Sequence, residues 1–211
     1  MIRIMIQQDR TPVHLHKGGA LLVTDVQNDF LPGGALGVPH GDKIIPFVNR
    51  ALSLFKKNGL LIFLSRDWHP LDHCSFKDQG GPWPPHCVQR TPGADFPSEL
   101  IIPEGSIIIS KGTQKDREQY STLGARDSEG NTESDIMKKR GIKRVFVVGL
   151  ATDYCVLNSV KDALAEGYEV YVLTDAIHAV NVNPGDGEKA LDEMIRAGTK
   201  LITTEMLQER K

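Results

Sequence analysis

Six short segments of this chain are apolar on both faces, and this feature constrains the fold more than any other. The segments span residues 20–25, 60–65, 106–110, 144–149, 169–173 and 200–203. Strands that bury both faces are typical of a parallel sheet with a layer of helices on each side. We therefore predict an α/β fold of three layers, with a mostly parallel, Rossmann-like sheet and helices on both faces.

Helical patterns lie between most of these segments. Residues 42–58 place Ile44, Val48 and Phe55 on one face, and Gly59 follows. Further helices are predicted over residues 132–140, from 153 to about 166, and over 188–197, each followed by a glycine. In an open parallel sheet, ligands bind outside the carboxyl ends of the strands, so functional side chains are expected there.

The length of 211 residues suits one domain, which we place at residues 19–211. Residues 1–18 form a predicted N-terminal extension. Within it Ile2, Ile4 and Ile6 alternate with Arg3 and Met5, as in a strand. We expect the extension to be an edge strand or a contact in a homo-oligomer.

Composition excludes several classes of function. The formal net charge is −2 and no basic stripe occurs, which argues against a nucleic-acid partner. The longest apolar runs are much too short to cross a membrane. Three cysteines without a CxxC pair argue against a disulfide framework and favour a reducing, cytoplasmic setting.

Cys155 occupies a position that suits a nucleophile. It follows the apolar segment 144–149, in the first turn of the next predicted helix. The positive end of a helix can lower a thiol pKa by about 1–5 units. Backbone N–H groups at Ala151 and Cys155 could also hold an oxyanion. A lone cysteine is nevertheless more often a small buried hydrophobe, so this reading needs partners.

Asp25 and Lys111 are those partners, because each follows the end of another predicted strand. A carboxylate can take the thiol proton and return it to a leaving amine. An ammonium stabilises both the thiolate and the carboxylate. Taken singly, Asp25 could be a loop cap and Lys111 a solvated charge, but three convergent strand ends favour a catalytic group.

A second cluster lies in the irregular segment 66–97, which is rich in proline and histidine. Asp67 and His69 are two residues apart on an extended stretch, and His86 arrives from the far side of the loop. Carboxylate and imidazole ligands suit zinc, iron or manganese, and three ligands leave a position open. The alternatives are a structural zinc site completed by Cys74 or Cys87, and histidines that are simply at the surface.

Together these motifs resemble the nicotinamidases, metal-dependent members of the isochorismatase-like cysteine hydrolases. The resemblance covers residues 19–205 and is carried, in the family's order, by residues 25–30, 67–70, 83–88, 111–113 and 149–156. It implies the isochorismatase-like hydrolase fold. It also implies hydrolysis of nicotinamide to nicotinate and ammonia through a cysteine thioester, within NAD salvage, and activity on pyrazinamide.

The resemblance also implies a role for each residue of the catalytic and metal sets. Cys155 would be the nucleophile, Asp25 the general base and acid, and Lys111 the charge stabiliser. One divalent metal ion would sit on Asp67, His69 and His86, with zinc expected first and iron or manganese as alternatives.

The substrate pocket follows from the same resemblance. Phe30 and Trp83 would sandwich the pyridine ring, and Tyr120 would form a wall of the pocket. The Leu150–Ala151 peptide bond would be cis. His73 lies four residues after His69, a spacing unlike that of a fourth ligand in relatives, so it is expected beside the ligands rather than among them.

Two other functions stay open at this point. Another amidohydrolase of the superfamily, of the N-carbamoyl amine hydrolase type, would share Asp25, Lys111 and Cys155 but lack the metal ligands. A non-catalytic α/β protein that binds a metal would carry an inert thiol at position 155.

Overall fold

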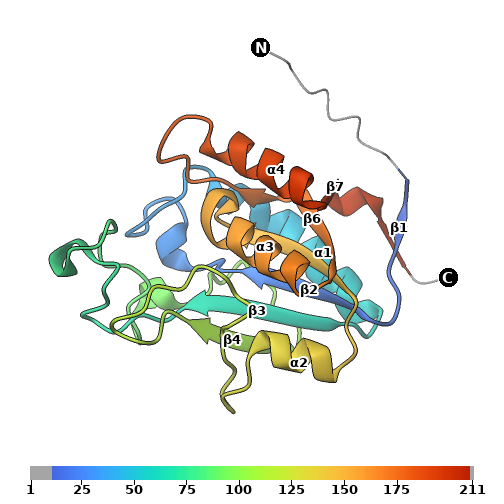
Figure 1. The fold of residues 1–211 in the computed structure, drawn as a ribbon, viewed down its shortest axis with the longest axis horizontal. Helices are drawn as coiled ribbons and strands as arrows, with labels where there is room; N and C mark the ends of the chain where they lie inside the picture. Colours follow the sequence, from blue (N-terminus) through green and yellow to red (C-terminus); the bar gives the residue numbers. More distant parts are fainter. Residues whose placement is uncertain (1–10, 210–211) are drawn as a thin grey trace.

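The computed structural model describes residues 11–209, and its centre is a six-stranded sheet (Figure 1). The strand order is β4-β3-β2-β5-β6-β7, and every neighbouring pair is parallel. This confirms the predicted parallel sheet. The strands are β2 (Gly19–Thr24), β3 (Leu61–Asp67), β4 (Ile107–Lys111), β5 (Arg144–Leu150), β6 (Glu169–His178) and β7 (Lys200–Ile202).

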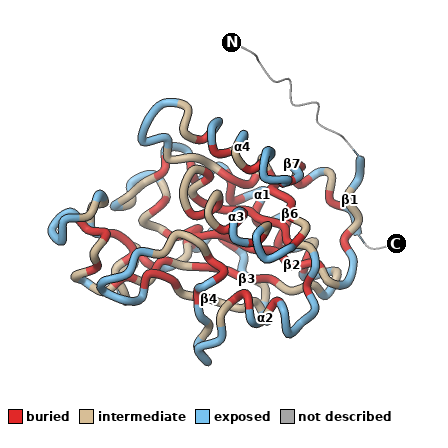
Figure 2. Tube along the Cα trace, in the orientation of Figure 1, coloured by how far each residue is buried: buried red, intermediate tan, exposed pale blue. Residues whose placement is uncertain are grey.

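Helices cover both faces of the sheet, as predicted. On one face lies α1 (Ile45–Lys57), which packs against Leu21 and Val23 of β2. The opposite face carries α2 (Glu133–Lys139), α3 (Leu157–Ala165) and α4 (Asp186–Ala197). Because side chains alternate along a strand, Ala20 and Leu22 point into this second core. Figure 2 shows the result, with the buried part of the chain running through the middle of the molecule.

Strand β6 extends to His178, five residues beyond the predicted end at residue 173. Polar side chains interrupt the apolar pattern there, and tertiary partners satisfy them. Thr174 Oγ1 donates to Ile202 O at 3.1 Å, and the Asp175 carboxylate accepts from Thr204 N and Oγ1 at 3.0 and 2.6 Å. These partners lie about 30 residues away in sequence, which a local pattern does not reveal.

The N-terminal region contributes a strand outside the main sheet. Strand β1 (Val13–His14) pairs in parallel with β8 (Leu207–Gln208) near the C-terminal end of the chain. Leu15 follows it and is buried in the core that also holds α1. The predicted strand at residues 2–6 lies outside the described residues, and the domain boundary at residue 18 stays a prediction.

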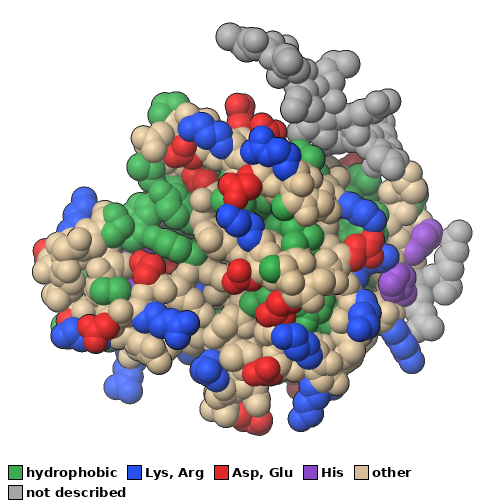
Figure 3. All heavy atoms as spheres, in the orientation of Figure 1, with side chains coloured by type: hydrophobic (Ala, Val, Ile, Leu, Met, Phe, Trp, Pro, Cys, Tyr) green, Lys and Arg blue, Asp and Glu red, His purple; other side chains and the backbone are tan. Residues whose placement is uncertain are grey.

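The surface drawn in Figure 3 carries acidic and basic side chains interspersed over the helices. Hydrophobic side chains gather on the same face, beside the loop that precedes α4. Over residues 11–209, no helix is both long enough and apolar enough to cross a membrane.

The connection order places a crevice between β2 and β5. From β2 the chain moves outward through β3 and β4, then returns to the other side of β2 as β5. Such a reversal is where open α/β sheets bind ligands. The two strands approach closely here, because a Cβ built on Gly149 (φ 110°) would lie 2.0 Å from Thr24 O. The residues that follow β2 and β5 therefore face one common space.

Candidate active site

The structure brings Asp25, Lys111 and Cys155 together at the carboxyl edge of the sheet. Asp25 follows β2, Lys111 is the last residue of β4, and Cys155 follows β5. Lys111 Nζ lies 3.0 Å from Asp25 Oδ2 and 3.3 Å from Cys155 Sγ. All three residues are buried. An ammonium group thus sits between the carboxylate and the thiol.

Neighbouring groups fix this arrangement. Ser65 Oγ donates to Asp25 Oδ1 at 2.6 Å and accepts from the Asp25 backbone N–H at 3.2 Å. Lys111 Nζ also donates to Gln119 O at 3.3 Å and to the carboxylate of Asp67. The ammonium therefore has four partners in the interior, which offset the cost of burying its charge.

Cys155 lies in a π-helical turn, Thr152–Val156, which leads directly into α3. The sequence pattern predicts an α-helix from residue 153. In the structure the first turn is instead a wider π-helical turn. The Leu150–Ala151 peptide before the turn is cis, as the resemblance implies. Ala151 O accepts from the backbone N–H groups of Tyr154 and Val156, both at 3.1 Å.

Burial dominates the titration of the thiol. It raises the pKa of Cys155 well above the usual range, although the Lys111 ammonium works in the opposite direction. The net shift is therefore upward, opposite in direction to the lowering that a position at a helix end can produce. Burial likewise raises the pKa of Asp25, again opposed by Lys111. A neutral thiol needs a base, and Asp25 Oδ lies within 4.8 Å of Cys155 Sγ.

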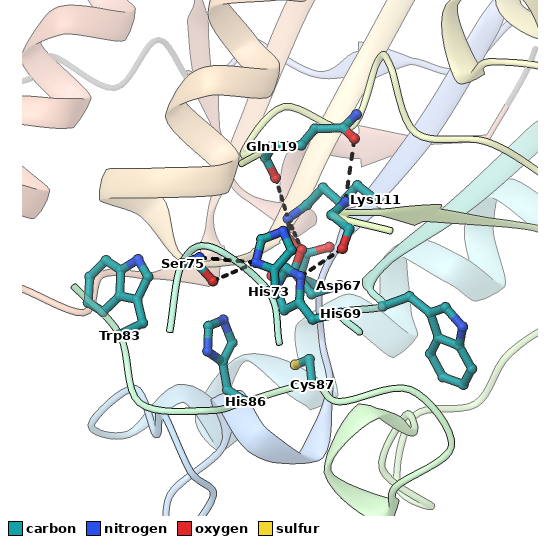
Figure 4. Close-up of polar contacts among 12 residues, drawn as sticks. Asp67, His69, His73, Ser75, Trp83, His86, Cys87, Lys111 and Gln119 are labelled. Carbon is teal, nitrogen blue, oxygen red and sulfur yellow. Dashed lines mark hydrogen bonds and ion pairs between the residues drawn. The ribbon is translucent and has the colours of Figure 1, made fainter. Parts of the chain in front are cut away.

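Asp67, His69 and His86 form a second buried cluster, whose ligand atoms lie within 4.8 Å of one another. Asp67 ends β3, whereas His86 reaches the cluster from a separate loop (Figure 4). His69 Nδ1 lies 2.9 Å from Gly112 O, and His86 Nδ1 lies 2.8 Å from Pro84 O. A carbonyl only accepts, so each Nδ1 carries the proton and each Nε2 is available as a ligand.

The donor set fits a divalent metal ion. Although burial opposes it, Lys111 and His69 hold the pKa of Asp67 well below its usual range, so this carboxylate is ionised. Burial lowers the pKa of His86, which keeps that imidazole neutral. One carboxylate and two imidazole nitrogens in a buried cluster suit an open divalent site.

His73, Cys74 and Cys87, which the sequence places near the predicted ligands, lie outside this cluster. The His73 ring stacks on His69 with centroids 4.1 Å apart, and both its nitrogens are engaged. Nδ1 lies 2.7 Å from Ser75 Oγ, and Nε2 lies 3.1 Å from Arg117 O. Among residues 11–209, neither Cys74 nor Cys87 belongs to a cluster that could hold a metal, so a structural zinc site is not supported.

Gln27 is a site residue that the sequence analysis missed. Its side-chain amide donates to Asp67 O at 2.8 Å and accepts from Asp67 N at 2.7 Å. It also donates to Ala94 O at 2.9 Å. Gln27 is buried and therefore fixes the backbone of a metal-cluster residue. The available signal was an amide side chain two residues after a strand end, beside Asp25.

One pocket joins the two clusters. Its polar side contains Asp67, His69, His86 and Cys155, and Glu118 lies on its lining. The apolar walls are Phe30, Leu36, Val38, Trp83, Tyr120, Ala151, Tyr154 and Val180. The three aromatic residues predicted for the pocket are all among them. Tyr154 was missed; its ring lies 5.1 Å from that of Trp83, whose Nε1 donates to Tyr120 Oη at 3.2 Å.

The comparison with known protein families agrees with this geometry. The isochorismatase domain family matches residues 19–206, which is most of the chain. The chain belongs to the isochorismatase family. This membership confirms the resemblance seen in the motifs, and the family's open α/β fold is the one observed.

Members of the family that this chain resembles include nicotinamidases. The nicotinamidase of Escherichia coli is 38% identical over 200 residues, covering 87% of this chain and 94% of that protein. A crystal structure of the pyrazinamidase of Pyrococcus horikoshii in complex with zinc is 49% identical, with a TM-score of 0.81, covering 88% and 99%. The L. infantum protein PnC1 in complex with nicotinate is 32% identical, with a TM-score of 0.85, covering 94% and 100%.

Proposed function

We propose that this protein is an amidohydrolase that converts nicotinamide into nicotinate and ammonia. The observation that carries the proposal is the shared pocket, in which a buried thiol and a carboxylate–imidazole cluster face the same aromatic walls. A flat heteroaromatic ring suits such walls, and its carboxamide would lie toward Cys155. The similarity to nicotinamidases and pyrazinamidases supports this choice of substrate.

In the first half of the reaction, Asp25 takes the proton from Cys155 Sγ as the sulfur attacks the carboxamide carbon. Lys111 stabilises the charge that forms on the sulfur. The oxygen of the tetrahedral intermediate would receive hydrogen bonds from the backbone N–H groups of Ala151 and Cys155. Asp25 then gives its proton to the amide nitrogen, the C–N bond breaks, and ammonia leaves a thioester.

In the second half, water replaces ammonia. Asp25 removes a proton from the water. The water oxygen attacks the thioester carbon at the same time, and the C–S bond breaks. Asp25 returns this proton to the sulfur, and the acid product gives its remaining proton to solvent and leaves as nicotinate. A raised pKa suits Asp25 for both roles, because a base with a pKa nearer neutrality also serves as an acid.

Asp67, His69 and His86 would hold one divalent metal ion, with zinc as the first choice and iron or manganese as alternatives. The bound ion would supply a Lewis-acidic anchor for the ring nitrogen. Gln27 keeps Asp67 in place for this task. Pyrazinamide has a comparable ring and carboxamide and is proposed as a second substrate. A role in NAD salvage and a cytoplasmic location belong to the same proposal.

The test is ammonia release from nicotinamide by the purified protein, with Cys155→Ala beside it. We expect rapid release that a chelator abolishes and that one of zinc, iron or manganese restores. Cys155→Ala should be inactive yet bind the metal at the wild-type ratio. No release by a folded, metal-loaded protein, together with hydrolysis of an N-carbamoyl amine, would overturn the proposed substrate.

A further inference from the structure

Beneath the thiol lies a chain of buried hydrogen bonds that the proposed reaction does not use. Ser159 Oγ donates to the carbonyl of Cys155 at 2.7 Å and accepts from the backbone N–H of Thr122 at 3.0 Å. Thr122 Oγ1 in turn donates to Glu133 Oε2 at 2.6 Å. Thr122, Glu133 and Ser159 are each at most 1% exposed. The chain thus links α2, a loop and the turn that carries the thiol.

The loop in question, residues 112–122, also contacts three further parts of the site. Gly112 O accepts from His69 Nδ1, and Gln119 O accepts from Lys111 Nζ. Tyr120 Oη accepts from Trp83 Nε1 on the pocket wall. A shift of this loop would therefore move a metal-cluster residue, the ammonium and the substrate wall relative to the sulfur.

We propose that Ser159 is a positioning residue, which keeps the turn of Cys155 in register with the loop of residues 112–122. A serine hydroxyl has one donor and two acceptor sites, so Ser159 can hold the two segments at once. Thr122 is fixed from its other side by Glu133. The inference rests on the proposed function for its effect on turnover, but its effect on the thiol does not depend on the substrate.

The variant Ser159→Ala removes both bonds, and Ser134→Ala is its matched control. Ser134 is also a buried helical serine, and its Oγ donates to Glu166 Oε2 at 2.5 Å, a contact between α2 and the end of α3. Both variants lose a buried hydroxyl and are expected to melt at lower temperature than the wild type. Of these two serines, Ser159 is the one whose hydroxyl contacts the turn that carries the thiol.

Two readouts separate positioning from stability. The first is the rate at which iodoacetamide alkylates Cys155, followed by peptide mass spectrometry so that Cys74 and Cys87 are counted apart. The second is kcat and KM for nicotinamide. We expect Ser159→Ala to slow alkylation several-fold and to lower kcat/KM about tenfold, through a lower kcat and a higher KM. Ser134→Ala should match the wild type in both readouts, and Ser159→Thr, which keeps the hydroxyl, should recover most of the loss.

Equal effects in Ser159→Ala and Ser134→Ala, or wild-type alkylation by Ser159→Ala, would overturn the inference. If Ser159→Ala does not fold, hydrogen exchange of the wild-type protein tests the inference instead. The Thr122 amide should be protected, and rapid exchange there would contradict the positioning role of Ser159. If the wild type releases no ammonia but the alkylation results hold, the proposed function fails and the positioning role stands.

Discussion

At the scale of single residues, the site combines a neutral thiol with a carboxylate and a fixed ammonium. Burial raises the pKa of both Cys155 and Asp25, and the Lys111 ammonium opposes both shifts. Although burial opposes its charge, Lys111 stays cationic, because the Asp25 and Asp67 carboxylates raise its pKa well above the usual value. Activation therefore depends on a base rather than on a resting thiolate.

This arrangement predicts the result of Asp25→Asn. The amide keeps the size of the side chain but cannot accept the thiol proton, so hydrolysis should fall by a factor of about 10² or more. Alkylation of Cys155 near pH 7 should slow as well, as measured by peptide mass spectrometry. Asp72→Asn is the control, because Asp72 is half exposed and its carboxylate pairs with Lys115 at the surface. Wild-type alkylation in Asp25→Asn would contradict its role as base.

His86 and His73 should differ in their effect on metal binding. His86→Ala removes a member of the buried cluster, so metal affinity should fall by at least about tenfold. His73→Ala removes only the ring stacked on His69 and should retain one metal ion per chain. Metal content after dialysis against a weak chelator measures both. Loss of the ion in His73→Ala with retention in His86→Ala would move the ligand role to His73.

At the scale of elements, the close approach of β2 and β5 creates the crevice that holds the site. Only a residue without a side chain fits at Gly149, because its backbone has positive φ and Thr24 lies against it. The strand pairing continues through this point, with Thr24 opposite Gly149. The glycine thus allows Asp25 and Ala151 to leave the sheet side by side.

Substituting Gly149 should therefore lower the free energy of unfolding much more than substituting a comparable glycine. Gly149→Ala should lower the free energy of unfolding by more than about 3 kcal/mol, or prevent folding, because its Cβ would overlap backbone atoms. Gly105→Ala is the control: it also has positive φ (84°), but nothing lies within 4 Å of its Cβ. That change should cost about 1–2 kcal/mol. Equal urea midpoints for the two variants would show that the contact with Thr24 relaxes freely.

At the scale of the whole molecule, one buried carboxyl group links folding to pH. Glu133 is fully buried in the first turn of α2, and its Oε1 has no hydrogen-bond partner among the described residues. Burial raises the pKa of Glu133 to about 8, whereas the unfolded chain has a value near 4.5. The folded protein therefore binds one more proton than the unfolded chain between these pH values.

The sign of the effect follows from this difference. Between about pH 4.5 and pH 8 the free energy of unfolding contributed by Glu133 should fall as the pH rises, since folding takes up a proton. Glu133→Gln cannot ionise, so its unfolding free energy should show a flatter pH dependence and should exceed that of the wild type above pH 8. Urea unfolding at pH 5, 7 and 8.5 measures this. If the unfolding free energies of the two proteins change in parallel with pH, the Glu133 carboxylate is solvated in the folded protein.

Local patterns predict most of the sheet because apolar runs and helix-ending glycines are properties of neighbouring residues. Local patterns fail where a residue distant in sequence determines the conformation. Strand β6 continues past residue 173 because Ile202 and Thr204 satisfy its polar side chains. The first turn at Cys155 is π-helical rather than α-helical, which hydrophobic periodicity does not register.

The sequence by itself determined the chemistry available to this protein: the order of strands and helices, and the carboxylate, ammonium, thiol and imidazole groups at their ends. Tertiary structure alone decided how those groups behave. It gave Asp67 its support from Gln27 and tied Cys155 to Ser159. It also reversed the expected shift of the thiol pKa. The reason is that burial and electrostatic interaction depend on all neighbours in space, whereas a sequence motif records only neighbours along the chain.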